Sequence, residues 1–257
     1  MQIKLVLIFT LITLSIFSRA DEPLSIAYGA DYRPFAWEQD GKPVGVQKDF
    51  VDKILVEKMG LNVHHVSCPW KRCQKFVRDG AVDAFFTVPT PERAEYTIAT
   101  ELAFYNTHFV MHTGKNKPFL ERLQTVRSIS DLEALREIRH IHMLGSGWHE
   151  RALRNMKHVS QINDGARIPL MLAYERADLY IEQLEMFRHQ AKQLGVVDRL
   201  VTIEEPSIRK LGWHVFIAKS SEYVRLIPMI DEELKLLKES GDLQKIKLEL
   251  FAKYGIK

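Results

Sequence analysis

The sequence lacks the short motifs that identify most nucleotide-binding and hydrolytic enzymes. It contains no Walker-type phosphate loop, no G-x-G-x-x-G loop, no H-E-x-x-H zinc motif and no G-x-S-x-G nucleophile elbow. His140 and His142 alternate on one face of an expected strand, but no third metal ligand accompanies them, so structural histidines are favoured. No metal or cofactor is therefore expected.

Cysteine is also scarce, with only Cys68 and Cys73 in the chain. Their spacing is neither a C-x-x-C redox motif nor half of a zinc site. In an oxidising compartment such a close pair can form a disulfide if a turn brings the two residues together, and two free thiols are the alternative. We predict the disulfide.

The chain has no large excess of charge of one sign. Its 36 basic residues nearly balance its 33 acidic ones, and Lys4 and Arg19 belong to the N-terminal segment. Without a basic field, nucleic acid is not an expected partner.

Only the N-terminus carries a long apolar run. Residues 5–17 follow Lys4 and precede Ser18-Arg19-Ala20, the layout of a cleavable signal peptide over residues 1–20. The run is too short for a good membrane span, although an uncleaved anchor is the alternative. No cysteine follows closely to accept a lipid. We expect cleavage after Ala20 and an exported, periplasmic protein.

A stretch near residue 90 organises the rest of the chain. An apolar strand at residues 84–88 stops at two prolines, and Thr90-Pro91 then has the form of a helix start. Arg93 is thereby delivered to the end of a strand, where ligands bind in open α/β sheets. An arginine there can hold a carboxylate through two parallel hydrogen bonds, and a solvated arginine is the alternative.

Further candidate ligand contacts follow other expected strands. Tyr32 and Phe35 lie in an aromatic loop after the first strand, where core packing is the alternative. Ser146 and Trp148 lie at a glycine-containing turn into a helix, and the hydroxyl suits a carboxylate unless it only caps the helix. Glu182 ends a later strand.

Strands and helices alternate twice along the chain, which argues for two parallel, doubly wound sheets. Residues 114–118 form the first clear break in composition, and residues 209–213 border a return. We therefore expect one lobe from residues 21–113 and 213–257, and a second from residues 114–212.

Several motifs occur in the order found in a known family. They are Tyr32-Arg33-Pro34-Phe35, Gly45-Val46 before Asp49-Phe50, Gly80-Ala81-Val82-Asp83-Ala84, Thr90-Pro91-Glu92-Arg93, Leu144-Gly145-Ser146 and Glu175-Arg176-Ala177-Asp178. Over residues 23–254 the chain resembles the solute-binding proteins of family 3, the periplasmic amino-acid-binding components of ABC importers.

The resemblance implies a periplasmic-binding-protein-like (type II) fold, in which two α/β lobes joined by two crossover strands close on a ligand. It implies that Tyr32 is the cleft aromatic, that Arg93 holds the carboxylate of the ligand, and that Ser146 is the hydroxyl residue of the second lobe. A monomer that is not an enzyme is expected, with a small-molecule ligand and an ABC permease or a membrane sensor as partner.

Two positions depart from the amino-acid-binding pattern of that family. Val88 stands where a serine or threonine usually donates to the carboxylate, and Gln183 stands where an aspartate usually holds the ammonium group. A buried ammonium needs an acidic partner. Either Glu182 replaces that aspartate or the ligand is an organic acid rather than an ordinary amino acid. An exported enzyme of the cyclohexadienyl dehydratase type, on the same scaffold, is a further alternative.

Overall fold

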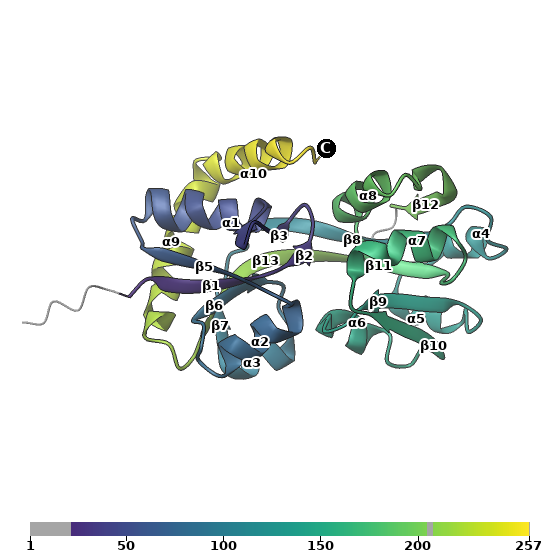
Figure 1. The fold of residues 1–257 in the computed structure, drawn as a ribbon, viewed down its shortest axis with the longest axis horizontal. Helices are drawn as coiled ribbons and strands as arrows, with labels where there is room; N and C mark the ends of the chain where they lie inside the picture. Colours follow the sequence, from purple (N-terminus) through teal and green to yellow (C-terminus); the bar gives the residue numbers. More distant parts are fainter. Residues whose placement is uncertain (1–21, 205–207, 257) are drawn as a thin grey trace, which may run out of the picture.

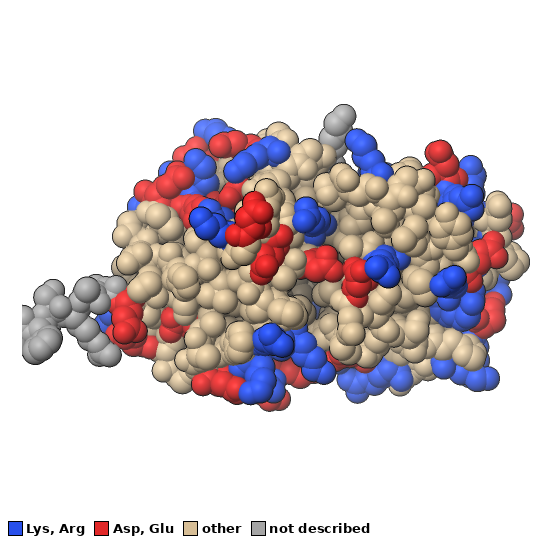
Figure 2. Space-filling model, in the orientation of Figure 1, with Lys and Arg blue, Asp and Glu red and all other residues tan. Residues whose placement is uncertain are grey.

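The computed structural model describes residues 22–204 and 208–256. The expected signal peptide and its cleavage site lie outside the described residues. Two lobes lie side by side, and long strands pass between them (Figure 1). No helix of the described part is long and apolar enough to cross a membrane. Lys and Arg are interspersed with Asp and Glu over the face seen in Figure 2.

The first lobe is built on three parallel strands in the order β5-β1-β6, with β7 and part of β13 added antiparallel. A small antiparallel sheet, β2-β3-β4, lies beside it. The strands are β1 (Leu24–Gly29), β2 (Asp31–Tyr32), β3 (Ala36–Gln39), β4 (Lys42–Val44), β5 (Val63–Cys68), β6 (Ala84–Thr87) and β7 (Thr97–Ala99).

Helices from both ends of the chain cover the first lobe (Figure 1). The helix after Gly45 forms in two parts, because an α-helical start continues as a π-helix. The helices are α1 (Val46–Val51), η1 (Asp52–Lys58), α2 (Trp70–Arg78), α3 (Pro91–Tyr96), η4 (Glu222–Leu226), α9 (Ile227–Glu239) and α10 (Asp242–Lys253).

The second lobe has three parallel strands in the order β10-β9-β11, and β11 continues antiparallel to β8. Ser128 caps helix α5 in a capping box with Asp131. The elements are α4 (Leu120–Leu123), α5 (Ile129–Glu133), β9 (Arg139–Met143), α6 (Gly147–Ala152), β10 (His158–Ile162), η2 (Gly165–Arg167), α7 (Ile168–Ala173), β11 (Leu179–Gln183), α8 (Leu184–Gln193), η3 (Val197–Arg199) and β12 (Leu200–Ile203).

Two long strands, β8 (Tyr105–Gly114) and β13 (Arg209–Ala218), join the lobes. They pair with each other over residues 105–109 and 209–213, and then each pairs with strands of a different lobe. Residues 111–114 pair with β12 of the second lobe, next to the boundary that the sequence predicts at residue 114. Gly114 marks the end of a strand that runs through the hinge.

A column of aromatic rings fills the core beside these crossing strands. Phe35, Trp213 and Tyr105 stack with small interplanar angles, 3° for Phe35 on Trp213 and 10° for Tyr105 on Trp213. Phe50 continues the column against Tyr105 at a centroid distance of 5.0 Å. Stacked pairs of this kind stabilise a core beyond the area that they bury.

Two of the sequence motifs have structural roles. Asp83 accepts hydrogen bonds from the backbone N–H and hydroxyl of Ser25 and from the hydroxyl of Ser221, so it ties β1 to the chain after β13. Asp178 pairs with Arg139 and with the buried Lys117. Carboxylates removed from water need such partners, so each motif stabilises its own lobe, Asp83 in the first and Asp178 in the second.

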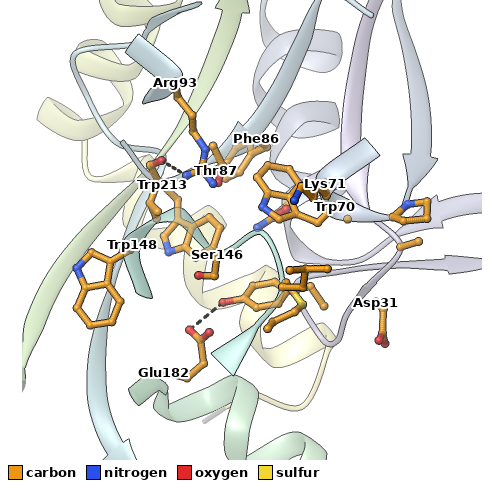
Figure 3. A pocket seen from close by; sticks show the side chains of 18 of the residues that line it. Asp31, Trp70, Lys71, Phe86, Thr87, Arg93, Ser146, Trp148, Glu182 and Trp213 are labelled. Carbon is orange, nitrogen blue, oxygen red and sulfur yellow. Dashed lines mark hydrogen bonds between the residues drawn. The ribbon is translucent and has the colours of Figure 1, made fainter. Parts of the chain in front are cut away.

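The structure joins Cys68 and Cys73 in a disulfide between the end of β5 and helix α2. Both cysteines are buried. The bond encloses the turn that carries Trp70, and this side chain faces the space between the lobes (Figure 3).

Candidate functional site

A cavity of about 300 Å³ lies between the lobes, at the carboxyl ends of the parallel strands. Arg93 enters it from one side and Glu182 from the opposite side (Figure 3). Aromatic and apolar side chains form most of the remaining wall, as in most small-molecule sites. The wall includes Asp31, Tyr32, Trp70, Lys71, Phe86, Thr87, Val88, Arg93, Phe109, Met143, Ser146, Trp148, Asn163, Glu182 and Trp213.

Arg93 is positioned by the helix start that the sequence predicts. Thr90 is the N-cap of α3, and its hydroxyl accepts a hydrogen bond from the backbone N–H of Arg93 at 3.3 Å. Pro91 occupies the first helical position, where its missing N–H costs nothing. The helix start therefore turns the arginine back toward the end of β6.

The guanidinium of Arg93 is buried and forms no ion pair with an acidic side chain of residues 22–204 or 208–256. Its Nη1 donates to the carbonyl oxygen of Val88 at 2.7 Å, and its Nη2 donates to Gln74 Oε1 at 3.4 Å. The ring of Trp70 lies 5.2 Å from the guanidinium carbon. The side chain is 4 % exposed, and Nε has no hydrogen-bond partner among the described residues.

Burial lowers the pKa of Arg93 to about 10, so the group stays charged at neutral pH. A buried cation without a counter-ion is costly, whereas an anion in the cavity would supply one. The alternative of a solvated surface arginine is therefore wrong.

Val88 contributes its carbonyl oxygen rather than a side-chain donor, because the hydroxyl expected there is missing. The hydroxyl residue of the preceding position, Thr87, lines the cavity instead. Although Val88 lacks the hydroxyl that is usual at its position, Thr87 supplies a hydroxyl residue at this end of the cavity.

Glu182 lies at the opposite end, near the end of β11, and is 5 % exposed. Its Oε1 accepts from the Tyr32 hydroxyl at 3.1 Å and from the Gln183 backbone N–H at 2.9 Å, and its Oε2 accepts from the Tyr180 hydroxyl at 3.0 Å. Burial raises the pKa of Glu182 to about 7, although the three donors oppose this shift. The carboxyl group is thus poised between its charged and neutral forms.

Gln183 does not reach the cavity. It is fully buried, and its side-chain amide donates to the Tyr32 hydroxyl from below the wall. The expectation that Gln183 contacts the ligand is corrected accordingly, since its amide is bonded to the Tyr32 hydroxyl and the residue does not line the cavity. Glu182 is the side chain of this pair that faces the cavity.

Phe35 is also corrected. It is fully buried in the aromatic column beside the hinge and does not line the cavity. Core packing, the alternative considered from the sequence, describes this residue. Tyr32 lines the cavity above it, with the two ring centroids 6.0 Å apart.

Ser146 and Trp148 line the cavity from the second lobe. The indole of Trp148 packs edge to face on Phe109, with ring centroids 5.0 Å apart. Ser146 occupies the N-cap position of α6, but its side chain makes no capping bond. Its hydroxyl lies 2.7 Å from Nδ1 of His149 instead.

Sequence reasoning missed much of the aromatic wall, including Trp70, Phe86, Phe109 and Trp213. Trp70 had a local signal, because it lies between the two cysteines. Trp213 had none, because its place in the wall follows from the pairing of β13 with β8.

Contacts across the cleft hold the lobes together. Besides the bond from Tyr32 to Glu182, Gln74 Nε2 donates to the Gly145 carbonyl oxygen at 3.3 Å, and Arg151 pairs with Glu92. In this structure the two lobes are therefore in direct contact across the cavity. No cluster of three or more metal-ligating side chains occurs among residues 22–204 and 208–256.

Solved structures similar to this one share its fold at low sequence identity. A histidine kinase sensor domain with similarity to periplasmic binding proteins has a TM-score of 0.72 at 18 % identity, covering 89 % of this chain and 95 % of its own. The arginine-, lysine-, histidine-binding protein ArtJ from Geobacillus stearothermophilus has a TM-score of 0.71 at 19 % identity, covering 90 % and 96 %.

An ancestral amino-acid-binding protein, a precursor of cyclohexadienyl dehydratase, has a TM-score of 0.68 at 19 % identity, covering 89 % and 95 %. A search of curated protein sequences found no match. The sequence profile of bacterial extracellular solute-binding proteins, family 3, matches residues 24–253. With its two lobes, crossing strands and interlobe cavity, the chain belongs to this family.

Proposed function

We propose that the protein captures a small carboxylate-bearing, amino-acid-like solute in the cavity between its lobes. The buried guanidinium of Arg93, which has no acidic partner, carries this proposal. A carboxylate in the cavity would complete its hydrogen bonds, and Nε is the donor that lacks a partner. The aromatic wall suits an apolar or planar remainder of the solute.

Glu182 is the proposed partner for an ammonium group of the solute. It is the buried carboxyl group that faces the cavity opposite Arg93, and it takes the role that Gln183 cannot perform. Separated positive and negative groups in one cavity match an amino acid better than a dicarboxylate, which would place a second negative charge near Glu182.

In this proposal the protein is exported to the periplasm by residues 1–20 and works as a monomer. Its partner is an ABC permease, as for the amino acid ABC transporter proteins among the similar structures, or a membrane sensor. The two routes share the same ligand-binding step. The two routes differ in which membrane protein, permease or sensor, then binds the ligand-loaded protein.

A catalytic role is the second candidate, on one observation. Glu182 has a pKa of about 7 inside a closed cavity, as a general acid requires. A dehydratase would consume a bound, prephenate-like acid, whereas a binding protein would return every ligand unchanged. The solute is incubated with an equal amount of the protein and then analysed by chromatography. A new product indicates a dehydratase, and unchanged solute indicates a binding protein.

The carboxylate site is tested by a thermal-shift screen of amino acids, organic acids and polyamines, followed by calorimetric titration of the best hit. Arg93→Met removes the charged guanidinium and keeps an unbranched apolar side chain in place of the arginine stem. It should weaken binding by roughly 2–5 kcal/mol, or about thirtyfold to several thousandfold.

The matched control is Arg78→Met. Arg78 lies on α2 of the same lobe, with its guanidinium over the Tyr96 ring and outside the cavity. It should leave the affinity unchanged. Equal affinity of wild type and Arg93→Met for the hit would disprove the carboxylate site, because a folded cavity would then bind without its cation.

A further inference from the structure

Ser146 and His149 form a hydrogen-bonded pair at the cavity wall whose direction can be worked out atom by atom. Nε2 of His149 lies 2.6 Å from the carbonyl oxygen of Ile181. A carbonyl oxygen only accepts, so Nε2 carries a hydrogen. A neutral imidazole has one N–H, and its other nitrogen, Nδ1, is then an acceptor.

His149 is held in its neutral form by its surroundings. The ring is 1 % exposed and stacks on His142 and Tyr180, with Trp148 against its edge. Its two hydrogen-bond partners are a carbonyl oxygen and a hydroxyl, neither of which is charged. Burial, followed by the nearby His142, lowers the pKa of His149 to about 3.

The hydroxyl of Ser146 therefore donates its single hydrogen to Nδ1 of His149, over 2.7 Å. What remains on the serine oxygen is acceptor capacity. Ser146 lines the cavity, so this oxygen is available to a solute bound there.

We infer that Ser146 acts toward the solute only as a hydrogen-bond acceptor, so that the solute carries an ammonium, amide N–H or hydroxyl donor facing the second lobe. This inference rests on the proposed function and reverses the role expected from the sequence, in which the hydroxyl helps to bind the carboxylate. Ser146 and Glu182 then form one acceptor wall, opposite the donors of Arg93.

A buried His149 of this kind is a poor catalytic base, which separates the pair from a hydrolytic dyad. An imidazole that resists protonation cannot take the serine hydrogen during an attack on a substrate. The pair fixes the direction of one hydrogen bond, and Ser146 is a specificity-determining residue.

A second buried imidazole supports the same strand from a different position. His112 donates through Nε2 to the carbonyl oxygen of Glu182 at 3.1 Å and accepts at Nδ1 from the Thr202 hydroxyl at 3.0 Å. Consecutive carbonyl groups of β11 are thus held by two neutral histidines. The acceptor wall is built on a rigid strand, so its polarity is fixed before a solute enters.

The direction of the bond is tested first without any ligand, on the exported chain labelled with ¹⁵N-histidine. Long-range ¹H–¹⁵N correlation at neutral pH should show His149 as the Nε2–H tautomer, with Nδ1 unprotonated and shifted as a hydrogen-bond acceptor. Ser146→Ala, which removes the donor, should move the Nδ1 signal and thereby assign it. A protonated Nδ1 at neutral pH would overturn the inference.

The consequence for recognition is tested with four acids that differ only at the α-carbon: leucine, α-hydroxyisocaproate, α-ketoisocaproate and isocaproate. The first two present a donor and the last two do not. Ser146→Ala should weaken leucine by roughly ten- to a hundredfold and the hydroxy acid by about three- to tenfold. The keto acid and isocaproate should change by less than about twofold, since they lose no bond.

Two variants keep this result interpretable. Ser146→Thr retains the hydroxyl and should retain the discrimination, which shows that the effect follows the oxygen rather than the packing. Ser160→Ala removes a second-lobe hydroxyl that donates to the His140 carbonyl oxygen, away from the cavity, and should change none of the four affinities.

Equal weakening of the keto and hydroxy acids by Ser146→Ala would contradict the acceptor role. Failure of all four acids to bind wild type would count against the amino-acid-like solute of the proposed function, while the spectrum of His149 would still decide the direction of the bond.

Discussion

The hydroxyl of Tyr32 donates to Oε1 of Glu182 over 3.1 Å, and this bond joins two residues 150 positions apart on opposite lobes. Tyr32 is in turn the acceptor of a bond from the Gln183 amide. The same contact therefore joins the lobes across the cleft and opposes the rise in the pKa of Glu182 that burial causes. The contact between the lobes and the ionisation of Glu182 therefore both involve the hydroxyl oxygen of Tyr32.

Removal of this hydroxyl should affect both properties at once. Tyr32→Phe deletes one of three donors to Glu182, so the pKa of that carboxyl group should rise further above its usual range. The loss of an interlobe hydrogen bond should cost the closed form about 1 kcal/mol. Carbon-13 NMR of the glutamate carboxyl groups measures the first effect, and small-angle scattering measures the second.

Tyr180→Phe is the matched control, because Tyr180 donates to the other oxygen of Glu182 from within the same lobe. It should also raise the pKa of Glu182, but the scattering radius should stay that of wild type. An increase in radius for both variants would show that the Tyr32 bond has no special part in closure.

Glu182 should also make the free energy of unfolding depend on pH. Its pKa is about 7 in the folded protein and near 4.5 in the unfolded chain. Between these values the folded state keeps a proton that the unfolded state has lost, so stability falls as pH rises from about 4.5 to 7. The buried histidines, with lowered pKa values, act in the opposite direction below pH 6.5.

The contribution of Glu182 is isolated by comparison with Glu182→Gln in urea unfolding at pH 5 and pH 8. The free energy of unfolding of the variant, relative to that of wild type, should increase by on the order of 2–3 kcal/mol as pH rises from 5 to 8. This increase should level off above about pH 7.5. A constant difference between the two proteins across this range would mean that Glu182 titrates as an ordinary glutamate.

Gln183→Asp tests whether the position that departs from the family pattern contacts the ligand. The residue is fully buried behind the wall, so a new carboxylate there would lie beside Glu182 without a cationic partner. We expect a loss of stability of roughly 1–3 kcal/mol and no gain in affinity for an ammonium-bearing solute. Denaturant unfolding and calorimetry measure the two, and tighter binding of such a solute would restore Gln183 as a ligand contact.

The parts of the site that the sequence predicts are those with local causes. The prolines and Thr90 determine where a strand stops and a helix begins, and this alone places Arg93 at the cavity. The parallel strands of each lobe follow from the alternation of apolar segments. Gln183 was misplaced because the local sequence does not show that its amide bonds to Tyr32, 151 positions away.

The parts that it does not predict depend on pairing between distant segments. Phe35 becomes a core residue because Trp213, from the other end of the chain, stacks on it. The local sequence does not show that the first half of β8 pairs with β13 from the far end of the chain. The direction of the bond at Ser146 depends on the carbonyl of Ile181, on a strand that the local sequence cannot bring near.

Three of the four tryptophans of the chain, Trp70, Trp148 and Trp213, line the cavity. They come from both lobes and from the hinge strand, and the indole N–H of Trp213 is bound to Thr107 on the partner strand at 2.8 Å. Most of the intrinsic fluorescence therefore arises where a solute would enter. Binding of a solute in the cavity can therefore be followed in real time by tryptophan fluorescence, without an added dye.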